Sequence, residues 1–118
     1  MDADDTDANV VARACAEAAW PNDRAVRTLN MQLVQVKPGQ ATIRMIVSED
    51  MLNAYEFCQG GFIFALADAA FAVASNTYDQ RTVLQHCDVT FINPARCGDE
   101  LIAQASERLR ARAFTTLP

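Results

Sequence analysis

Residues 59–76 read QGGFIFALADAAFAVASN, and this stretch decides the fold. From about Phe62 to Asn76 it predicts a helix that is apolar on every side except at Asp68. A helix of that kind is enclosed by protein rather than by water. Because the chain has only 118 residues, we expect a sheet or a second subunit to enclose it.

Two strands are predicted on the amino-terminal side of this helix. Residues 29–36 and 41–47 alternate between apolar and polar positions, as half-buried strands do. The parity changes at Val34, which predicts a bulge or burial on both sides there. Residues 37–40 read KPGQ, a tight turn with proline at its second position, so the two strands should form a hairpin.

Two more strands are predicted on the carboxy-terminal side, at residues 82–92 and 101–110. In the second of these, Leu101, Ala103 and Ala105 share one face. Strands without regularly alternating crossover helices favour an α+β fold, with an antiparallel sheet wrapped around one long helix.

A further helix is predicted at residues 8–19, with Asp7 as its N-cap, and Pro21 and Asn22 should end it. Its apolar face, read from the i, i+3, i+4 spacing, consists of Val10, Val11, Ala14, Cys15, Ala18 and Ala19. No repeat or linker divides the chain, so residues 1–118 are interpreted as one domain. We expect the acidic residues 1–7 to be disordered.

The net charge of −5 argues against nucleic acid as a partner, because proteins that bind it usually present a basic face. The chain starts without a positively charged leader, and its longest apolar stretch is broken by Asp68. That stretch is shorter than the ~20 residues that a membrane span needs. We therefore expect a cytoplasmic protein that does not enter a membrane.

The four cysteines and the single histidine are scattered, without the clustered spacing that a zinc site needs. We therefore expect no metal and interpret the cysteines as buried, reduced thiols. Cys58 has no histidine near it in the sequence to form a thiolate pair, so we do not expect it to act as a nucleophile.

Asp68 and the glycines before it are the candidates for chemistry. An ionised carboxylate in an apolar helix is costly to desolvate unless it has a partner, and no basic residue lies within two turns of it. Alternatively, Asp68 is a structural residue whose carboxylate is hydrogen-bonded by a neighbouring strand or subunit. Gly60 and Gly61 open the helix, where free backbone N–H groups can polarise a carbonyl; a glycine pair can also be a plain loop.

The spacing of Gly60 and Asp68 bears on where such a site would lie. They are eight residues apart, which is about 12 Å along a helix. Reacting groups must approach to within about 3 Å, so the two residues cannot act on one carbonyl from the same chain. If both serve one reaction, the site lies at a symmetric interface, with Gly60 of one subunit facing Asp68 of another.

These motifs resemble those of one known family. Met51-Leu52-Asn53, Cys58-Gln59-Gly60-Gly61 and the segment at residues 64–71 resemble the phenylacetate-degradation (PaaI-type) hotdog thioesterases. The segments at residues 90–94 (TFINP) and 98–101 (GDEL) resemble that family's later motifs. The resemblance covers about residues 29–105.

The resemblance implies a hotdog fold and hydrolysis of aryl-acetyl or other acyl-CoA thioesters. It assigns Asp68 as nucleophile or general base, Gly60 as the backbone donor to the thioester carbonyl, and Asn53 as the residue that orients substrate or water. Gln59 and Gly61 would contact the substrate. It implies no cofactor, since CoA is part of the substrate, and an assembly of two or four identical chains.

The chain departs from the family pattern in two places. Gln59 replaces the motif histidine, and glutamine cannot titrate near neutral pH. Residues 108–118 form a basic tail in place of further strand pattern. We therefore expect a truncation or a reading-frame change that removes the last two strands of the fold.

Two other functions remain open. A catalytically impaired relative that binds acyl-CoA, or is purely structural, fits the two departures. A hydroxyacyl dehydratase would need a histidine beside a carboxylate, but His86 lies in a predicted strand away from the helix start. A histidine satisfied within its strand is the simpler interpretation of His86.

Overall fold

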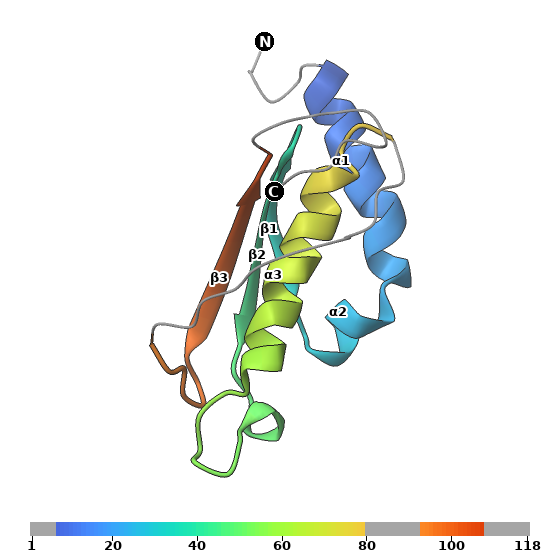
Figure 1. Ribbon diagram of the computed structural model, residues 1–118. Helices are drawn as coiled ribbons and strands as arrows, with labels where there is room; N and C mark the ends of the chain where they lie inside the picture. Colours follow the sequence, from blue (N-terminus) through green and yellow to red (C-terminus); the bar gives the residue numbers. More distant parts are fainter. Residues whose placement is uncertain (1–6, 80–92, 108–118) are drawn as a thin grey trace, which may run out of the picture.

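The computed structural model describes residues 7–79 and 93–107. A three-stranded antiparallel sheet of order β1-β2-β3 lies against one long helix, α3 (Gly60–Ser75), which confirms the predicted α+β class. The strands are β1 (Gln32–Lys37), β2 (Gln40–Ile46) and β3 (Glu100–Ser106). Figure 1 shows α3 running along one face of the sheet, where it contacts mainly β2 and β3.

The predicted hairpin is confirmed. β1 and β2 pair from Lys37 opposite Gln40, so Pro38 and Gly39 form a two-residue turn between them. Gly39 has φ +69°, a left-handed conformation that glycine adopts at little cost. The register shifts between Leu33 and Gln35, which confirms the bulge.

The core lies between the sheet and α3. The alternating residues Ala41, Ile43 and Met45 of β2 are buried beneath the helix, and Val47 continues the pattern past the strand end. On α3 the facing stripe is Leu66, Ala70 and Ala74, spaced four residues apart as neighbours on one helix face are. In β3 the predicted parity is confirmed, because Leu101, Ala103 and Ala105 are half-buried while the residues between them are exposed.

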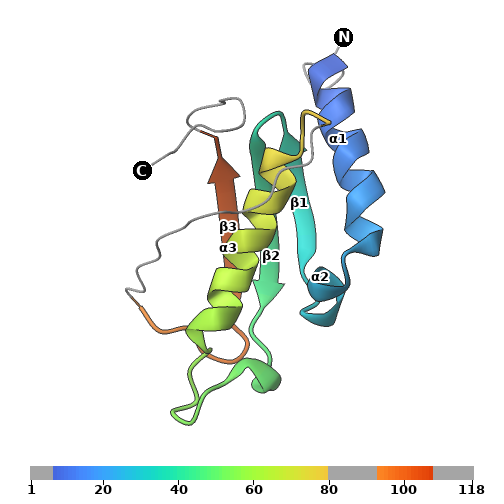
Figure 2. The same ribbon diagram turned by 45° about the vertical axis from the view of Figure 1, so that its right-hand side comes forward.

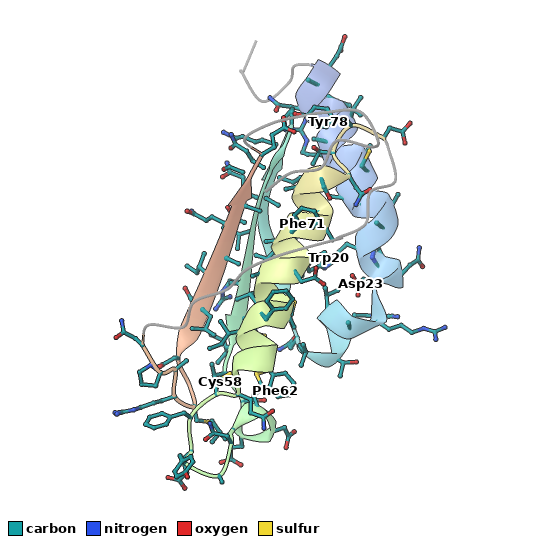
Figure 3. All side chains as sticks on the ribbon, in the orientation of Figure 1. Trp20, Asp23, Cys58, Phe62, Phe71 and Tyr78 are labelled. Atoms are coloured by element: carbon teal, nitrogen blue, oxygen red, sulfur yellow. The ribbon has the colours of Figure 1, made fainter. Side chains whose placement is uncertain are left out.

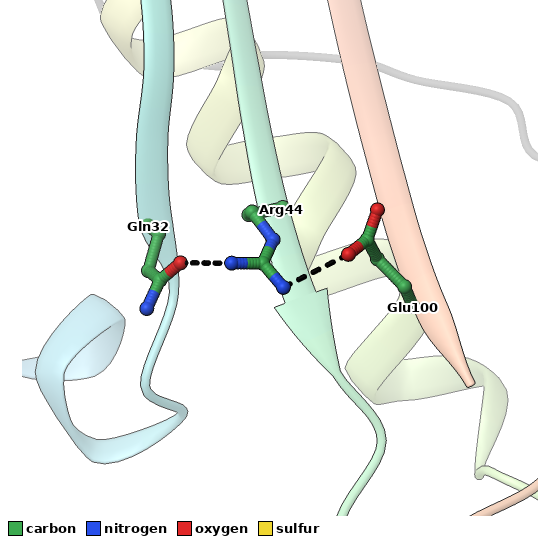
Figure 4. A network of polar contacts seen from close by, with 3 residues as sticks. All are labelled: Gln32, Arg44 and Glu100. Atoms are coloured by element: carbon green, nitrogen blue, oxygen red, sulfur yellow. Dashed lines mark hydrogen bonds and ion pairs between the residues drawn. The ribbon is translucent and has the colours of Figure 1, made fainter. Parts of the chain in front are cut away.

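The opposite face of the sheet is mixed, with exposed Ile46 and Ile102 beside polar residues. Arg44 of β2 donates hydrogen bonds to Gln32 on β1 and to Glu100 on β3, and its distance to Glu100 is 2.8 Å (Figure 4). One residue therefore links all three strands. Both charged side chains are partly exposed, so we expect the ion pair to contribute at most about 1 kcal/mol.

Helix α1 (Asp7–Ala19) lies along the β1 side of the sheet, as Figures 1 and 2 both show. A helix in this place covers a strand edge that would otherwise be free to pair with another chain. It begins at Asp7 itself, which the sequence predicts as the N-cap.

The predicted apolar face of α1 is wrong. Its buried residues are Ala12 and Ala16, whereas Val10 and Val11 are 48% and 43% exposed. Valine and alanine occur on several sides of this helix, so the sequence alone does not single out one face. Burying the small alanines allows the helix to approach β1 closely.

A short helix, α2 (Arg24–Thr28), is absent from the sequence-based prediction. It follows the 3-10 turn η2 (Trp20–Asn22), and Asp23 caps it by accepting a hydrogen bond from Val26 N at 3.2 Å. Five residues are too few to establish a helical period, so this segment gives no signal beyond its capping aspartate. As a result β1 begins at Gln32 rather than at Leu29.

The predicted strand at residues 82–92, the tail at 108–118 and the start at 1–6 lie outside the described residues, as do His86 and Cys87. Within the part of the chain that is described, no helix has the length and apolarity to cross a membrane. The interpretation of the cysteines needs one correction, since Cys97 is exposed and Cys15 is half-buried.

Candidate functional site

The candidate site begins at the amino-terminal end of α3. Gln59 is its N-cap residue, with extended backbone, and Gly60 is the first helical residue. Gln59 N donates to Met51 O at 2.8 Å, and Phe62 N donates to Gln59 O at 3.0 Å. The N–H groups of Gly60 and Gly61 have no acceptor among residues 7–79 and 93–107. Within this part of the chain they are unpaired first-turn donors at the positive end of the helix dipole.

Gly61 provides space, and neither glycine at the helix start has an unusual backbone conformation. Among the described glycines only Gly39 and Gly98 have positive φ, so nothing in the backbone at Gly60 or Gly61 requires glycine. A Cβ added at Gly61 would meet no atom within 4 Å. The helix start is therefore open enough for a ligand to approach the main chain.

Two loops hold this helix start in place. Cys58 N donates to Ala95 O at 2.8 Å, and isolated β-bridges join Leu52 to Cys58 and Phe57 to Arg96. Figure 3 shows Cys58 and Phe62 together at this end of α3. Cys58 is buried, and that burial raises the pKa of its thiol. A thiol that keeps its proton is a poor nucleophile, in line with the expectation for Cys58.

Asn53 shapes the loop that leads into α3. Its Oδ1 accepts hydrogen bonds from Tyr55 N at 2.9 Å and from Phe57 N at 3.1 Å. Its backbone N–H also donates to Phe57 O at 2.7 Å. The carboxamide oxygen is therefore committed to the loop, and only the Nδ2 donor is left for the predicted role in orienting substrate or water.

Asp68 lies in the middle of α3, on the side away from the sheet. It follows buried Leu66 by two residues, which places it about 200° around the helix from that residue. The side chain is half-buried, and within the described residues it has no hydrogen bond or ion pair. Neighbouring Phe64 and Phe71 do not belong to the core between α3 and the sheet.

The structure brings together some of the predicted site residues but not all of them. Gln59, Gly60 and Gly61 form the helix start, and Asn53 braces the loop just before it. Asp68 lies on the same helix but more than two turns further on, about 12 Å along the axis. One copy of the chain therefore does not place Asp68 beside the free N–H groups.

The turn at residues 93–99 is predicted by the sequence, but its contacts with the loop before α3 are not. Arg96 places its guanidinium carbon 5.5 Å from the centre of the Phe57 ring, and Ala95, next to it, is buried against Cys58. The available signal was the turn formed by Pro94 and Gly98. That signal says nothing about which distant loop the turn meets.

Comparison with known proteins gives one family and several close relatives. Residues 55–115 match the family model of the thioesterase superfamily. The acyl-coenzyme A thioesterase PaaI of Escherichia coli is 37% identical over 93 residues, or 79% of this chain and 66% of that protein. A protein of Archaeoglobus fulgidus, provisionally named an esterase, is 36% identical over 88 residues, or 75% of this chain and 57% of that protein. The chain thus spans about 57–66% of the length of these two relatives.

The solved structures agree with the sequence comparison. The structure of the PaaI protein from the phenylacetic acid degradation operon of E. coli superposes with a TM-score of 0.86 and 34% sequence identity. The match covers 87% of this chain and 75% of that one.

Proposed function

Because the chain belongs to the thioesterase superfamily, and within it to the PaaI-type hotdog thioesterases, we propose that it hydrolyses acyl-CoA thioesters at a site shared by two copies. The observation that carries this proposal is the arrangement along α3. At its start the helix has N–H donors, and on the side away from the sheet it has a carboxylate; neither has a partner among the described residues.

The first turn of α3 would bind the thioester carbonyl. The N–H of Gly60 donates to the carbonyl oxygen, and the helix dipole stabilises the negative charge that develops on it. The open space at Gly61 admits the substrate to the main chain. The side chain of Gln59, which is exposed and makes no capping hydrogen bond, is available to contact the acyl group.

Asp68 of the second copy would supply the attacking group. Its carboxylate either attacks the carbonyl carbon or removes a proton from the water that does so. If the carboxylate attacks, the carbon–sulfur bond breaks to leave a mixed anhydride on Asp68, which water then hydrolyses to the free acid. If it activates water, the same bond breaks as the acid forms directly. In both cases the thiolate takes a proton that comes from water, and CoA leaves as the thiol. The separation of about 12 Å between Gly60 and Asp68 within one helix is why two copies are needed. A twofold axis would create two such sites in each dimer, alone or within a tetramer.

The acyl group we propose is aryl-acetyl, because the E. coli relative of known structure comes from the phenylacetic acid degradation operon. Hydrolysis needs only water and the substrate, so we propose no cofactor. The test is release of CoA from phenylacetyl-CoA, with Asp68→Asn as the comparison. Loss of the carboxylate should lower kcat by at least about a hundredfold. Equal rates for the two proteins, with the same circular dichroism spectrum, would contradict the proposal.

A second function is favoured by one observation at the helix start. Gln59 stands where the family motif has histidine, and it offers hydrogen bonds but no group that titrates near pH 7. A protein that binds acyl-CoA without hydrolysing it would show heat of binding in calorimetry and no release of thiol. If the missing histidine is the reason for the lost activity, Gln59→His should raise turnover. If the protein is already an active thioesterase, its hydrolysis of acyl-CoA does not depend on that substitution.

A further inference from the structure

Building on the proposed function, we propose that Arg96, held over the ring of Phe57, binds the phosphates at the nucleotide end of the acyl-CoA. The reacting carbonyl and the phosphates of this substrate lie at opposite ends of its pantetheine arm. A thioester bound at the start of α3 therefore extends its anionic end over the neighbouring surface.

Arg96 is fixed in that neighbourhood by its backbone. It forms a β-bridge with Phe57, and the adjacent Ala95 accepts the hydrogen bond from Cys58 N at 2.8 Å. Phe57 and Cys58 directly precede Gln59 and Gly60, the residues that open α3. The strand-like pairing of these two loops places an arginine beside the start of the helix.

The side chain of Arg96 is held by a ring and, in the described part of the chain, by no carboxylate. The guanidinium carbon lies 5.5 Å from the Phe57 ring centre, a distance at which a cation is attracted to the face of the ring. Among residues 7–79 and 93–107 the guanidinium has no carboxylate partner, although the residue is exposed. By contrast, Arg44 is paired with Glu100.

The acidic groups nearby make the position of this arginine matter. Asp99 Oδ2 accepts from the backbone N–H of Arg96 at 2.8 Å, and exposed Glu56 precedes Phe57. These carboxylates repel phosphate. Binding of an anionic ligand is therefore favourable here only where the ligand contacts the guanidinium directly. Arginine binds phosphate through two parallel hydrogen bonds, which lysine cannot do.

An exposed aromatic ring adjoins the same loop. Tyr55 is 82% exposed, and the loop that carries it is shaped by Asn53. An exposed ring of this kind can stack on a nucleotide base, as aromatic residues do in other nucleotide-binding surfaces. Tyr55 lies in the same loop as Phe57, which is bridged to Arg96, and we call these three residues the nucleotide patch. A ring and a cation are the groups that bind the base and the phosphates of an adenine nucleotide.

The experiment compares two thioesters that differ only at this end. Phenylacetyl-CoA carries the nucleotide, and the phenylacetyl thioester of N-acetylcysteamine lacks it. In Arg96→Ala we expect KM for phenylacetyl-CoA to rise about tenfold, the size of a charge-assisted contact at an exposed site. The KM for the short thioester and kcat for both should not change. Arg24→Ala, which removes an exposed arginine of α2, is the matched control and should change neither KM.

Salt and a binding measurement complete the design. Added salt should raise KM for phenylacetyl-CoA in the wild type and in Arg24→Ala, and much less in Arg96→Ala, because exposed charges are screened. Calorimetry with CoA alone should show about tenfold weaker binding in Arg96→Ala, whether or not the protein hydrolyses the ester. Binding of CoA without turnover would therefore contradict the proposed hydrolysis but not the role of Arg96.

Two outcomes would overturn the assignment. If Arg96→Ala raises KM equally for both thioesters, the arginine positions the loop through Phe57 and does not touch phosphate. If CoA binds equally to the wild type and Arg96→Ala, or binds to neither, the patch is not a nucleotide site.

Discussion

Thr77 Oγ1 accepts a hydrogen bond of 2.7 Å from the backbone N–H of Gly39, a residue 38 positions earlier in the chain. The same hydroxyl donates to Ala74 O at 2.9 Å, and Thr77 is only 2% exposed. The carboxy-terminal end of α3 is thereby tied to the turn between β1 and β2. Because a buried N–H without a partner is costly, this hydroxyl fixes the helix against the hairpin.

Thr77→Val should destabilise the fold by about 1–3 kcal/mol, since it keeps the side-chain shape but leaves the Gly39 N–H without an acceptor. Urea unfolding followed by circular dichroism measures this difference. Thr77→Ser retains the hydroxyl and should lose less. Equal stability of the valine and serine variants would show that the hydrogen bond is not what matters.

Gly39→Ala should cost about 1 kcal/mol, because φ +69° strains any residue with a Cβ. The new Cβ would also lie 2.5 Å from Cδ of Glu107, but that side chain can move aside. Gly98 offers the matched comparison, with φ +90° and no atom within 4 Å of an added Cβ. Similar unfolding free energies for Gly39→Ala and Gly98→Ala would assign the cost to the backbone. Rescue of Gly39→Ala by Glu107→Ala would instead assign it to the contact.

The thiol of Cys58 should make folding stability depend on alkaline pH. Burial raises its pKa in the folded chain above the ordinary value of 9.0, so above about pH 9 the unfolded chain holds fewer protons on this group than the folded chain. Stability from this source is complete below pH 9 and falls as pH rises towards the folded pKa. Unfolding free energies at pH 7, 9 and 10 should therefore fall less steeply in Cys58→Ala. Parallel curves for the two proteins would contradict this.

Accessibility of the thiols gives an independent check on the same residue. At pH 8, iodoacetamide should label exposed Cys97 well before buried Cys58, as peptide mass spectrometry would show. Early labelling of Cys58 would mean that the start of α3 opens readily in solution.

Two substitutions of Asn53 distinguish whether its Oδ1, which holds the loop, or its Nδ2, which could contact substrate or water, is needed for activity. Asn53→Asp keeps an oxygen that accepts from Tyr55 N and Phe57 N, whereas Asn53→Ala removes it. If the residue acts through the loop, kcat/KM should fall about tenfold in the alanine variant and little in the aspartate variant. If its Nδ2 contacts substrate or water, both variants should be equally impaired. Proteolysis at exposed Tyr55 should rise only in the alanine variant.

The parts of this protein that follow from the sequence are those whose pattern is local. The unbroken apolar run before and after Asp68 predicted α3, and alternation predicted the buried residues of β2. Proline and glycine at positions 38 and 39 predicted the hairpin turn, since the backbone angles that these residues favour are their own property. The motifs between Met51 and Phe71, together with those at residues 90–94 and 98–101, likewise predicted the family. Their individual roles in catalysis remain predictions.

Other features depended on which segments meet in space. The exposed side of α1 was predicted as buried because its alanines and valines do not distinguish one face, and contact with β1 selects Ala12 and Ala16. The Asn53 oxygen is taken up by its own loop, and Arg96 lies over Phe57 although 39 residues separate them. The apolar periodicity of a helix or strand shows which of its residues lie on the same side of that element. Only the tertiary structure decides what that side contacts, because packing energy depends on the partner surface as well as on the segment itself.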